Sequence, residues 1–145
     1  MKSVNRFCRL VLAALAAFLA LAGTARALEL KPVTVAQGLE RPWGLAFLPD
    51  GRMLVTEREG RLRIVEANGR VSEPLPGLPS ISVGNQCGLL DVVADPRFAD
   101  NQRIFFSFAE PAASGGGNST AVASARLVGE RLEDVRTIFS QAPKI

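Results

Sequence analysis

From residue 43 onward, short apolar runs alternate with turn-forming residues along the chain. The apolar runs 43–48 and 53–57 flank a Pro-Asp-Gly turn, in which proline fixes φ and Asp-Gly tolerates positive φ. A third run, 61–65, alternates arginine with apolar residues over its first four positions, which is typical of a strand wetted on one face. The pattern predicts three strands joined by tight turns, with a weaker fourth strand that begins at Val71.

A second set of apolar runs follows a proline-rich stretch and has a similar organisation. Strands are expected at 88–93, 103–108, 120–127 and 134–139. Each set opens with a Gly-Leu pair, at Gly44 and at Gly88, a spacing of 44 residues. Four-stranded units that repeat every 40–50 residues or so are typical of β-propeller blades. A β-sandwich also has short strands and frequent turns and remains the alternative, but consecutive hairpins without a long crossover favour the propeller.

The length of the chain limits how many blades it can hold. Without its first 27 residues the chain has 118, enough for two to three units of this length. Propellers typically close with about four to eight blades, and an open array leaves an apolar face uncovered. We therefore expect an all-β fold, and we expect the chain to be the N-terminal part of a longer propeller protein or the product of a disrupted gene.

The N-terminal segment 1–27 has the organisation of a cleavable secretion signal. Basic residues precede the apolar run 10–21, and Ala-Arg-Ala at 25–27 offers small residues at the two positions that signal peptidase recognises. The apolar run is shorter than the roughly 20 residues that a helix needs to span a bilayer, so no stable membrane anchor is expected. The sequence predicts cleavage after Ala27, a periplasmic or secreted location, and a propeller-type domain at 28–145.

Charge, histidine and cysteine content narrow the function classes further. Four of the 17 basic residues and none of the 14 acidic residues lie in the predicted signal, so the remainder has a net charge of −1. That charge does not favour nucleic-acid binding, which needs a basic face. The chain contains no histidine, which excludes Ser-His-Asp catalysis and the common histidine zinc sites within it. Cys87 is the one cysteine of the predicted mature chain, so no intrachain disulfide is expected.

Individual polar motifs indicate no catalytic or metal site by themselves. The glycine-rich stretch 114–118 lacks the Gly-Lys-Ser/Thr of a phosphate-binding loop and is interpreted as a hairpin loop. The spacing of the aspartates matches no EF-hand calcium loop. Trp43 is expected to pack in the core or between blades, and Arg58 and Arg61 are expected to be solvated hairpin charges. The sequence therefore assigns no catalytic residue and no metal ligand within this chain.

The order of several segments is more specific than any one of them. These segments are LERPWGLAFLPDG at 39–51, LVTEREG at 54–60, QCGLLDV at 86–92, DPRF at 95–98 and IFFSF at 104–108. In this order they closely resemble the soluble PQQ-dependent sugar dehydrogenases of the glucose/sorbosone dehydrogenase family, and most of all the periplasmic aldose sugar dehydrogenases of bacteria. The resemblance extends from about Leu39 to Ile145.

This resemblance implies a fold and an activity for the protein from which the chain comes. Family members are six-bladed β-propellers, of which this chain would hold about two to three blades. They bind pyrroloquinoline quinone (PQQ) near the channel mouth, with calcium on the cofactor, and oxidise the anomeric carbon of an aldose to a lactone. A histidine acts as the general base, while the cofactor accepts the hydride.

Little of that site can be transferred residue by residue. Gln86 matches the glutamine that lines the sugar pocket of the family, and its amide can both donate to and accept from sugar hydroxyls. The resemblance places the catalytic histidine, the calcium ligands and the later cofactor-binding residues beyond Ile145. The chain is therefore expected to be inactive alone and to bind neither PQQ nor calcium fully, and no cofactor-binding residue is assigned within it.

Cys87 departs from the family pattern, which usually has glycine at this position. A side chain there is expected to crowd the pocket, and to restrict the backbone if the position needs a positive φ. Two other interpretations stay open: a non-catalytic extracytoplasmic propeller that binds sugars or protein partners, and a lactonase of the related calcium propellers. The sequence indicates neither the preferred sugar nor the electron acceptor.

Overall fold

The computed structural model describes residues 30–113 and 115–144. The predicted secretion signal at 1–27 lies outside these residues, so its cleavage site and the domain boundary at residue 28 stay predictions. The chain divides into the units 1–33 and 34–145, and the description below concerns the second unit. In its described residues this unit has two antiparallel β-sheets and one short helix, which confirms the predicted all-β fold. No helix among the described residues has the length and apolar character needed to cross a membrane.

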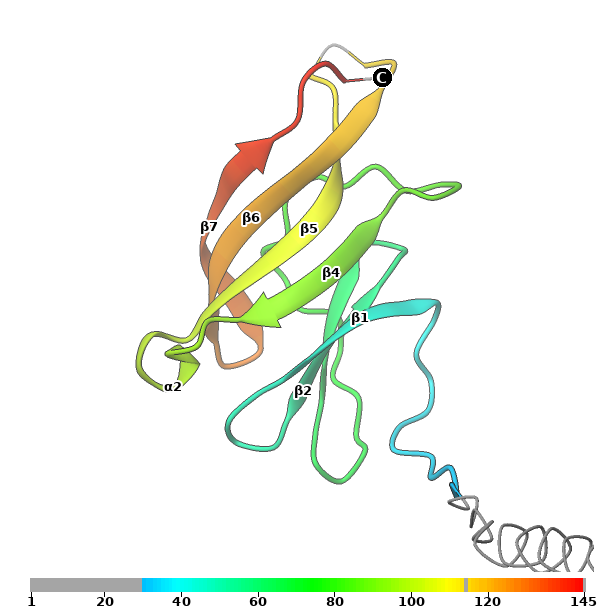
Figure 1. The fold of residues 1–145 in the computed structure, drawn as a ribbon, viewed down its shortest axis with the longest axis vertical. Coiled ribbons are helices and arrows are strands. Elements are labelled where there is room, and N and C mark those ends of the chain that lie inside the picture. Colours follow the sequence, from blue (N-terminus) through cyan, green and yellow to red (C-terminus); the bar gives the residue numbers. More distant parts are fainter. Residues whose placement is uncertain (1–29, 114, 145) are drawn as a thin grey trace, which may run out of the picture. The chain divides into compact units, whose positions relative to one another are not determined.

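The first sheet is a meander of three short strands (Figure 1). Its strands are β1 (Pro42–Phe47), β2 (Met53–Glu57) and β3 (Arg61–Val65), which pair in the order β1-β2-β3. The β1–β2 connection closes through a hydrogen bond from the backbone N–H of Gly51 to the carbonyl of Leu48 (3.1 Å). Gly51 has a φ of 87°, as its place in the predicted Pro-Asp-Gly turn requires.

The predicted fourth strand of this sheet does not form as a regular strand. Val71 makes only an isolated bridge to Val65. The chain after it still runs beside β3, because the backbone N–H groups of Ser72 and Leu75 donate to the carbonyls of Ile64 and Leu62 (both 2.8 Å). Proline at position 74 has no N–H to donate, so the ladder is interrupted between these two bonds. The prediction of a weaker fourth strand was wrong in that no regular strand forms, although the segment lies beside β3 as expected.

The second sheet is a longer meander of four strands. It consists of β4 (Leu89–Ala94), β5 (Arg103–Pro111), β6 (Asn118–Val128) and β7 (Arg131–Ser140), paired in that order. All four were predicted, but β7 begins three residues earlier than expected. Asp134 has a φ of 50°, and the pairing register with β6 shifts nearby, so the alternating pattern is broken at this point.

The connection between β4 and β5 contains a short helix, α2 (Phe98–Asn101), which the sequence pattern did not predict. The helix is anchored by the buried side chain of Phe98. It ends at Gln102, whose φ of 52° is left-handed. With only four residues, the helix is too short to show a helical periodicity.

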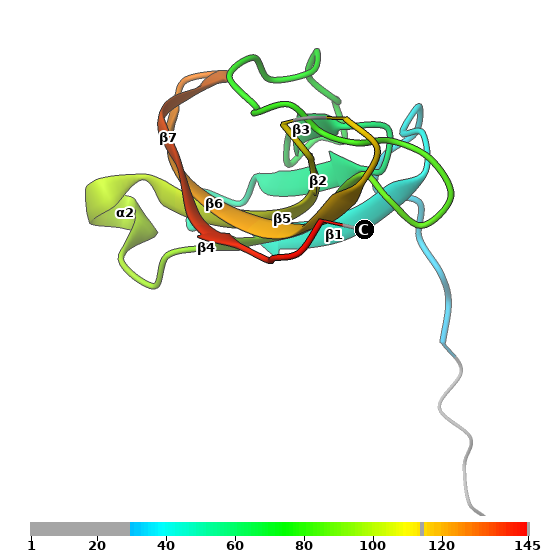
Figure 2. The same cartoon turned by 90° about the horizontal axis from the view of Figure 1, so that it is seen from above.

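A single apolar core lies between the two sheets. Leu54, Leu62 and Ile64 from the first sheet belong to the same buried cluster as residues of β4, β5 and β6. Phe106 lies opposite Ala123 on the neighbouring strand, so a large and a small side chain share the space. Viewed from above, β4 of the second sheet lies beside β1 of the first (Figure 2). The two sheets are thus packed against each other through the first strand of each.

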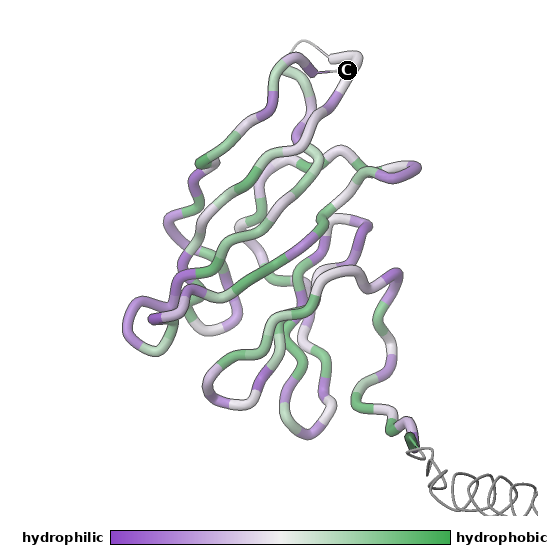
Figure 3. The backbone as a smooth tube through the Cα atoms, in the orientation of Figure 1, coloured by the Kyte–Doolittle hydropathy of each residue, from purple (hydrophilic) through white to green (hydrophobic). Residues whose placement is uncertain are grey.

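The outer faces of both sheets also carry apolar side chains. On β1, Leu45 and Phe47 alternate with buried residues, and Phe47 is 75% exposed. On the second sheet, Val93 and Phe139 are each about half exposed. Coloured by hydropathy, the strands carry hydrophobic stretches interrupted by hydrophilic residues (Figure 3). Each sheet of this unit therefore has apolar residues on both of its faces, not only on the face toward the other sheet.

Candidate functional site

Several connections gather at one end of the two sheets, which we call the loop end. It comprises the residues before β1, the β2–β3 turn at 58–60, the turn at 84–87 before β4, and the start of β6 at Asn118. These segments contact each other: the backbone N–H of Leu89 donates to the carbonyl of Arg58 (3.3 Å), and Cys87 contacts Asn118. In Figure 1 the chain leading into β4 lies near the β2–β3 turn.

Gln86 lies at the tip of a tight turn in the loop end. The backbone N–H of Cys87 donates to the carbonyl of Gly84 (2.7 Å) and closes the turn, while Asn85 adopts a left-handed φ of 47°. The side chain of Gln86 is exposed. Among the described residues, nothing covers its amide, so a ligand could reach it. The predicted contact with a sugar stays a prediction.

Cys87 is half-buried and ties this turn to the second sheet. Its thiol lies 3.2 Å from the side-chain oxygen Oδ1 of Asn118, at the start of β6. The described non-glycine residues with positive φ do not include Cys87; the positive φ angles belong to Gly84 (139°) and Gly88 (148°) on either side. The backbone restriction considered for Cys87 therefore falls on Gly88 instead.

Gly88 is required by a close approach between the two sheets. A Cβ atom at this position would lie 2.0 Å from the carbonyl oxygen of Arg58, far closer than any side chain can come. The carbonyl of Gly88 accepts a hydrogen bond from the backbone N–H of Ala109 (2.9 Å). The residue just after the turn is thus held between β5 and the end of β2.

Arg58 and Trp43 form a stacked pair at the loop end. The guanidinium carbon of Arg58 lies 5.3 Å from the centroid of the Trp43 ring, a cation–π distance. Trp43 is 55% exposed, so it does not lie in the core of the described residues, while its packing between blades stays a prediction. Arg58 is half-buried, and its Nε–H has no hydrogen-bond partner among the described residues. The prediction of a solvated hairpin charge was wrong for Arg58, because the tryptophan ring covers it.

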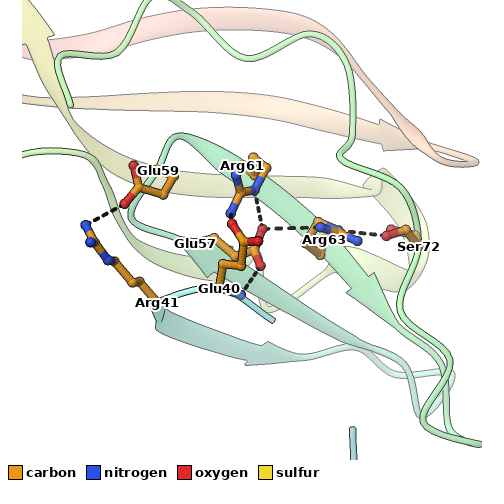
Figure 4. A network of polar contacts seen from close by, with 7 residues as sticks. All are labelled: Glu40, Arg41, Glu57, Glu59, Arg61, Arg63 and Ser72. Atoms are coloured by element: carbon orange, nitrogen blue, oxygen red, sulfur yellow. Dashed lines mark hydrogen bonds and ion pairs between the residues drawn. The ribbon is translucent and has the colours of Figure 1, made fainter. Parts of the chain in front are cut away.

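A buried carboxylate lies next to this pair in the sequence (Figure 4). Glu57 is fully buried, and its carboxylate accepts hydrogen bonds from Arg61 Nε (2.6 Å), from Arg63 Nη1 (3.3 Å) and from the backbone N–H of Glu40 (2.5 Å). Burial raises the pKa of Glu57, but these hydrogen bonds outweigh it and hold the pKa below its ordinary value of 4.5. Arg61 also binds Glu40 (2.7 Å), so the prediction of a solvated charge was wrong here too.

The sequence contains a local signal for part of this network. Glu57 and Arg61 flank the β2–β3 turn and are cross-strand partners, so opposite charges face each other once the hairpin forms. A glutamate that ends an otherwise apolar strand, followed four residues later by arginine, indicates a paired and not a solvated carboxylate. Arg41 extends the network on the exposed side through its ion pair with Glu59 (2.7 Å).

A second polar cluster lies where the chain leaves β7. Lys144 forms an ion pair with Glu110 and lies 3.0 Å from Ser119 Oγ and 3.1 Å from Ser140 Oγ. The hydrogen bond from Lys144 lowers the pKa of Glu110. The hydroxyl of Ser119 donates to the carbonyl of Gln141 (2.6 Å). This cluster fastens segment 141–144 to the second sheet and leaves its cation paired.

The polar side chains described above differ in whether a carboxylate already pairs with them. Gln86 offers an exposed amide and Arg58 a guanidinium, whereas Arg41 and Lys144 are paired with carboxylates. Among the residues that the structure describes, no group of three histidine, cysteine, aspartate or glutamate side chains could hold a metal ion. The described residues therefore assign no ligand for calcium and no complete set of contacts for a quinone with several carboxylates.

Comparison with known proteins identifies the family. The matching family model is Glucose / Sorbosone dehydrogenase, over residues 39–145. The chain is 44% identical over 110 residues to the aldose sugar dehydrogenase YliI of Escherichia coli, covering 74% of this chain and 29% of that protein. It is 41% identical over 119 residues to the uncharacterized protein slr1608 of Synechocystis, covering 77% of this chain and 28% of that protein.

Solved structures give the same result. The soluble aldose sugar dehydrogenase of Escherichia coli in its apo form matches with a TM-score of 0.72 and 42% identity, over 77% of this chain and 33% of that one. The PQQ-bound aldose sugar dehydrogenase of Streptomyces coelicolor matches with a TM-score of 0.61 and 33% identity, over 77% and 34%. The chain thus spans about a third or less of the length of these relatives.

The fold and these matches define the class of protein: the two antiparallel sheets correspond to a portion of the β-propeller sugar dehydrogenases. More particularly, the chain belongs to the glucose/sorbosone dehydrogenase family, as its motifs had indicated.

Proposed function

We propose that the chain is the N-terminal portion of a PQQ-dependent dehydrogenase that oxidises the anomeric carbon of aldose sugars to lactones. The observation that carries this proposal is the 42–44% identity to aldose sugar dehydrogenases over about three quarters of the chain. A relative at 33% identity has a PQQ-bound form, which supports the same cofactor for this protein. Calcium on the cofactor remains part of the proposal by resemblance.

The contribution of this chain to the reaction would be to bind and orient the sugar. Gln86 is the residue that we assign to this role, because its exposed amide can accept from one hydroxyl and donate to another. PQQ, when bound, supplies the acceptor for the hydride. Because the chain contains no histidine, the general base would come from elsewhere in the longer protein.

The exposed apolar faces support the proposal that further sheets belong to the same propeller. Leu45 and Phe47 on one side and Val93 and Phe139 on the other would be buried if each sheet had a neighbour on both sides. The relatives are about three times as long as the region that they share with this chain. We also propose that the protein is exported, with the segment 1–27 removed after Ala27 and no membrane anchor retained.

The test compares two proteins under the same conditions. The 145-residue chain, mixed with PQQ, calcium, glucose and an artificial electron acceptor, should show no turnover. The product of the continued reading frame should reduce the acceptor with at least one aldose. Dye reduction by the short chain would contradict its assignment as an incomplete portion. Sugar binding by the longer protein without turnover on any of several aldoses would favour the non-catalytic propeller.

A further inference from the structure

Thr56, at the end of β2, connects the two sheets through its hydroxyl. The side chain is fully buried. Its Oγ1 accepts a hydrogen bond from the backbone N–H of Gly44 on β1 (2.8 Å) and donates to the carbonyl of Leu90 on β4 (2.5 Å). One hydroxyl therefore satisfies a backbone group of its own sheet and one of the neighbouring sheet, and both would otherwise lack this partner.

The two sheets approach each other at this point without room for side chains. A Cβ atom on Gly44 would lie 2.9 Å from Cα of Asp91 and 3.0 Å from the carbonyl oxygen of Leu90. β1 and β4 are therefore in backbone contact, which leaves the Thr56 hydroxyl as the polar link across the junction. Since close contact fixes the spacing and the hydrogen bond fixes the register, a shift of β4 along β1 would break both.

The next two residues, Glu57 at the end of β2 and Arg58 directly after it, extend the same connection. The backbone N–H of Arg58 donates to the carbonyl of Arg41 (3.1 Å), and its carbonyl accepts from the N–H of Leu89 (3.3 Å). Glu57, between them, holds the segment before β1 through the N–H of Glu40 and holds β3 through Arg61. Thus Thr56, Glu57 and Arg58 together bind the starts of β1, β3 and β4.

The turn that carries Gln86 is mounted directly on this junction. Gly84 and Cys87 close the turn, Gly88 lies against Arg58, and Leu89 and Leu90 are the two residues bonded to the end of β2. Only Cys87 and Gly88 separate Gln86 from the first of these bonds. We infer that Thr56 is a positioning residue, whose buried hydroxyl sets the register of β4 and thereby the place of the Gln86 amide at the loop end.

A purely structural role is the competing interpretation, in which Thr56 stabilises the fold without any special effect on the turn. Thr56→Val separates the two, because valine has nearly the shape of threonine but no hydroxyl. Thr56→Ser is the matched variant that keeps the hydroxyl and loses a methyl group. Leu127→Ala is the second control: Leu127 is buried in the core at the other end of β6, and its truncation lowers stability far from the turn.

Hydrogen exchange of the full protein, read by mass spectrometry or NMR, measures how firmly the turn is held in place. We expect Thr56→Val to speed exchange at the amides of Cys87 and Leu89 by roughly tenfold, the effect of one lost buried hydrogen bond. Thr56→Ser should leave these exchange rates within about twofold of those in the unaltered protein. Leu127→Ala should not speed exchange at Cys87 and Leu89 more than at other amides. Equal effects of Thr56→Val and Leu127→Ala on these amides would overturn the inference.

If Thr56→Val does not fold, native-state exchange in the unaltered protein gives the answer. The amides of Gly44, Cys87 and Leu89 should then open together at low denaturant, as one cooperative unit. Separate opening of the Cys87 amide, with Gly44 and Leu89 still protected, would equally overturn the positioning role.

The kinetic part of the inference rests on the proposed function, and it has its own readout. With an aldose substrate, Thr56→Val should raise KM several-fold and change kcat less than twofold, because the Gln86 amide binds the sugar but does not move the hydride. Thr56→Ser should restore KM. If even the unaltered protein oxidises no aldose, the proposed function fails, while hydrogen exchange still decides whether Thr56 positions the turn.

Discussion

At the scale of single residues, the loop end owes its geometry to groups that are buried and paired. Glu57 is the clearest case, because a fully buried carboxylate with two arginine partners is costly to disrupt. Cys87 and Gln86 depend on the same region for their placement. The residue that the resemblance emphasised is therefore exposed, whereas those that hold it in place are hidden in the strand before it.

Replacement of Glu57 by glutamine should destabilise the protein by about 3 kcal/mol, because two half-buried arginines lose the buried carboxylate that balances their charge. Glu66→Gln is the matched control, since Glu66 pairs with the exposed Arg70 at 3.3 Å and should cost less than about 1 kcal/mol. Urea denaturation of both variants checks this. A similar small loss for both would show that the Glu57 network adds nothing beyond a surface ion pair.

The ionisation of Glu57 should also make the stability of the protein depend on pH. The folded pKa of Glu57 lies below 4.5, so its stabilisation is fully present above about pH 4.5 and is lost as the pH falls through the lowered value. The stability difference between the unaltered protein and Glu57→Gln should thus be larger near pH 7 than near pH 3. Denaturation curves at the two pH values measure it, and an unchanged difference would contradict the assignment.

At the scale of elements, the strands followed from alternation and turn chemistry, but their contacts with each other did not. The runs 53–57 and 61–65 were predicted with the bounds that the structure has. An Asp-Gly turn precedes the first run, and a Glu-Gly turn lies between the two. The helix α2 was not predicted, because four residues are too few to show the 3.6-residue periodicity of apolar positions in a helix. The close contact between Gly88 and Arg58 brings together two residues that are 30 positions apart and lie at the ends of strands in different sheets. No local sequence pattern predicts such a contact.

Two glycines of the same loop give a matched test of that fit. Gly84 and Gly88 have similar φ angles, 139° and 148°, but a Cβ meets nothing within 4 Å at Gly84 and meets the Arg58 carbonyl at 2.0 Å at Gly88. Gly84→Ala should cost only backbone strain of about 1–3 kcal/mol. Gly88→Ala should cost clearly more, or prevent folding. Thermal unfolding of both compares them, and equal midpoints would contradict the close approach.

At the scale of the whole molecule, the two sheets form one core between them and leave apolar residues on their outer faces. The sequence pattern supported this arrangement through the spacing of 44 residues between Gly44 and Gly88. Gln86 could be singled out only through the family resemblance, since an exposed turn glutamine has no pattern of its own. In the buried network at 56–58, only the Glu57–Arg61 pair has a local pattern, because the other partners come from strands far apart in the sequence.

Polar substitutions on the outer faces of the sheets should have opposite effects in the short chain and in the longer protein. Phe47→Ser and Phe139→Ser should improve the solubility of the 145-residue chain at little cost in stability, because both rings are more than half exposed. In the longer protein the same changes should lower the melting temperature, since we propose that further sheets cover these rings. Unchanged stability of the longer protein would contradict this coverage.

The most direct measurement is the steady-state oxidation of aldoses by the longer protein loaded with PQQ, with and without Gln86. We expect lactone formation by the unaltered protein, and a KM raised about tenfold or more in Gln86→Ala, because a lost sugar hydrogen bond is worth about 1–2 kcal/mol. Lactone formation with the same KM in both proteins would remove Gln86 from the sugar site. No lactone from any aldose would contradict the proposed activity itself.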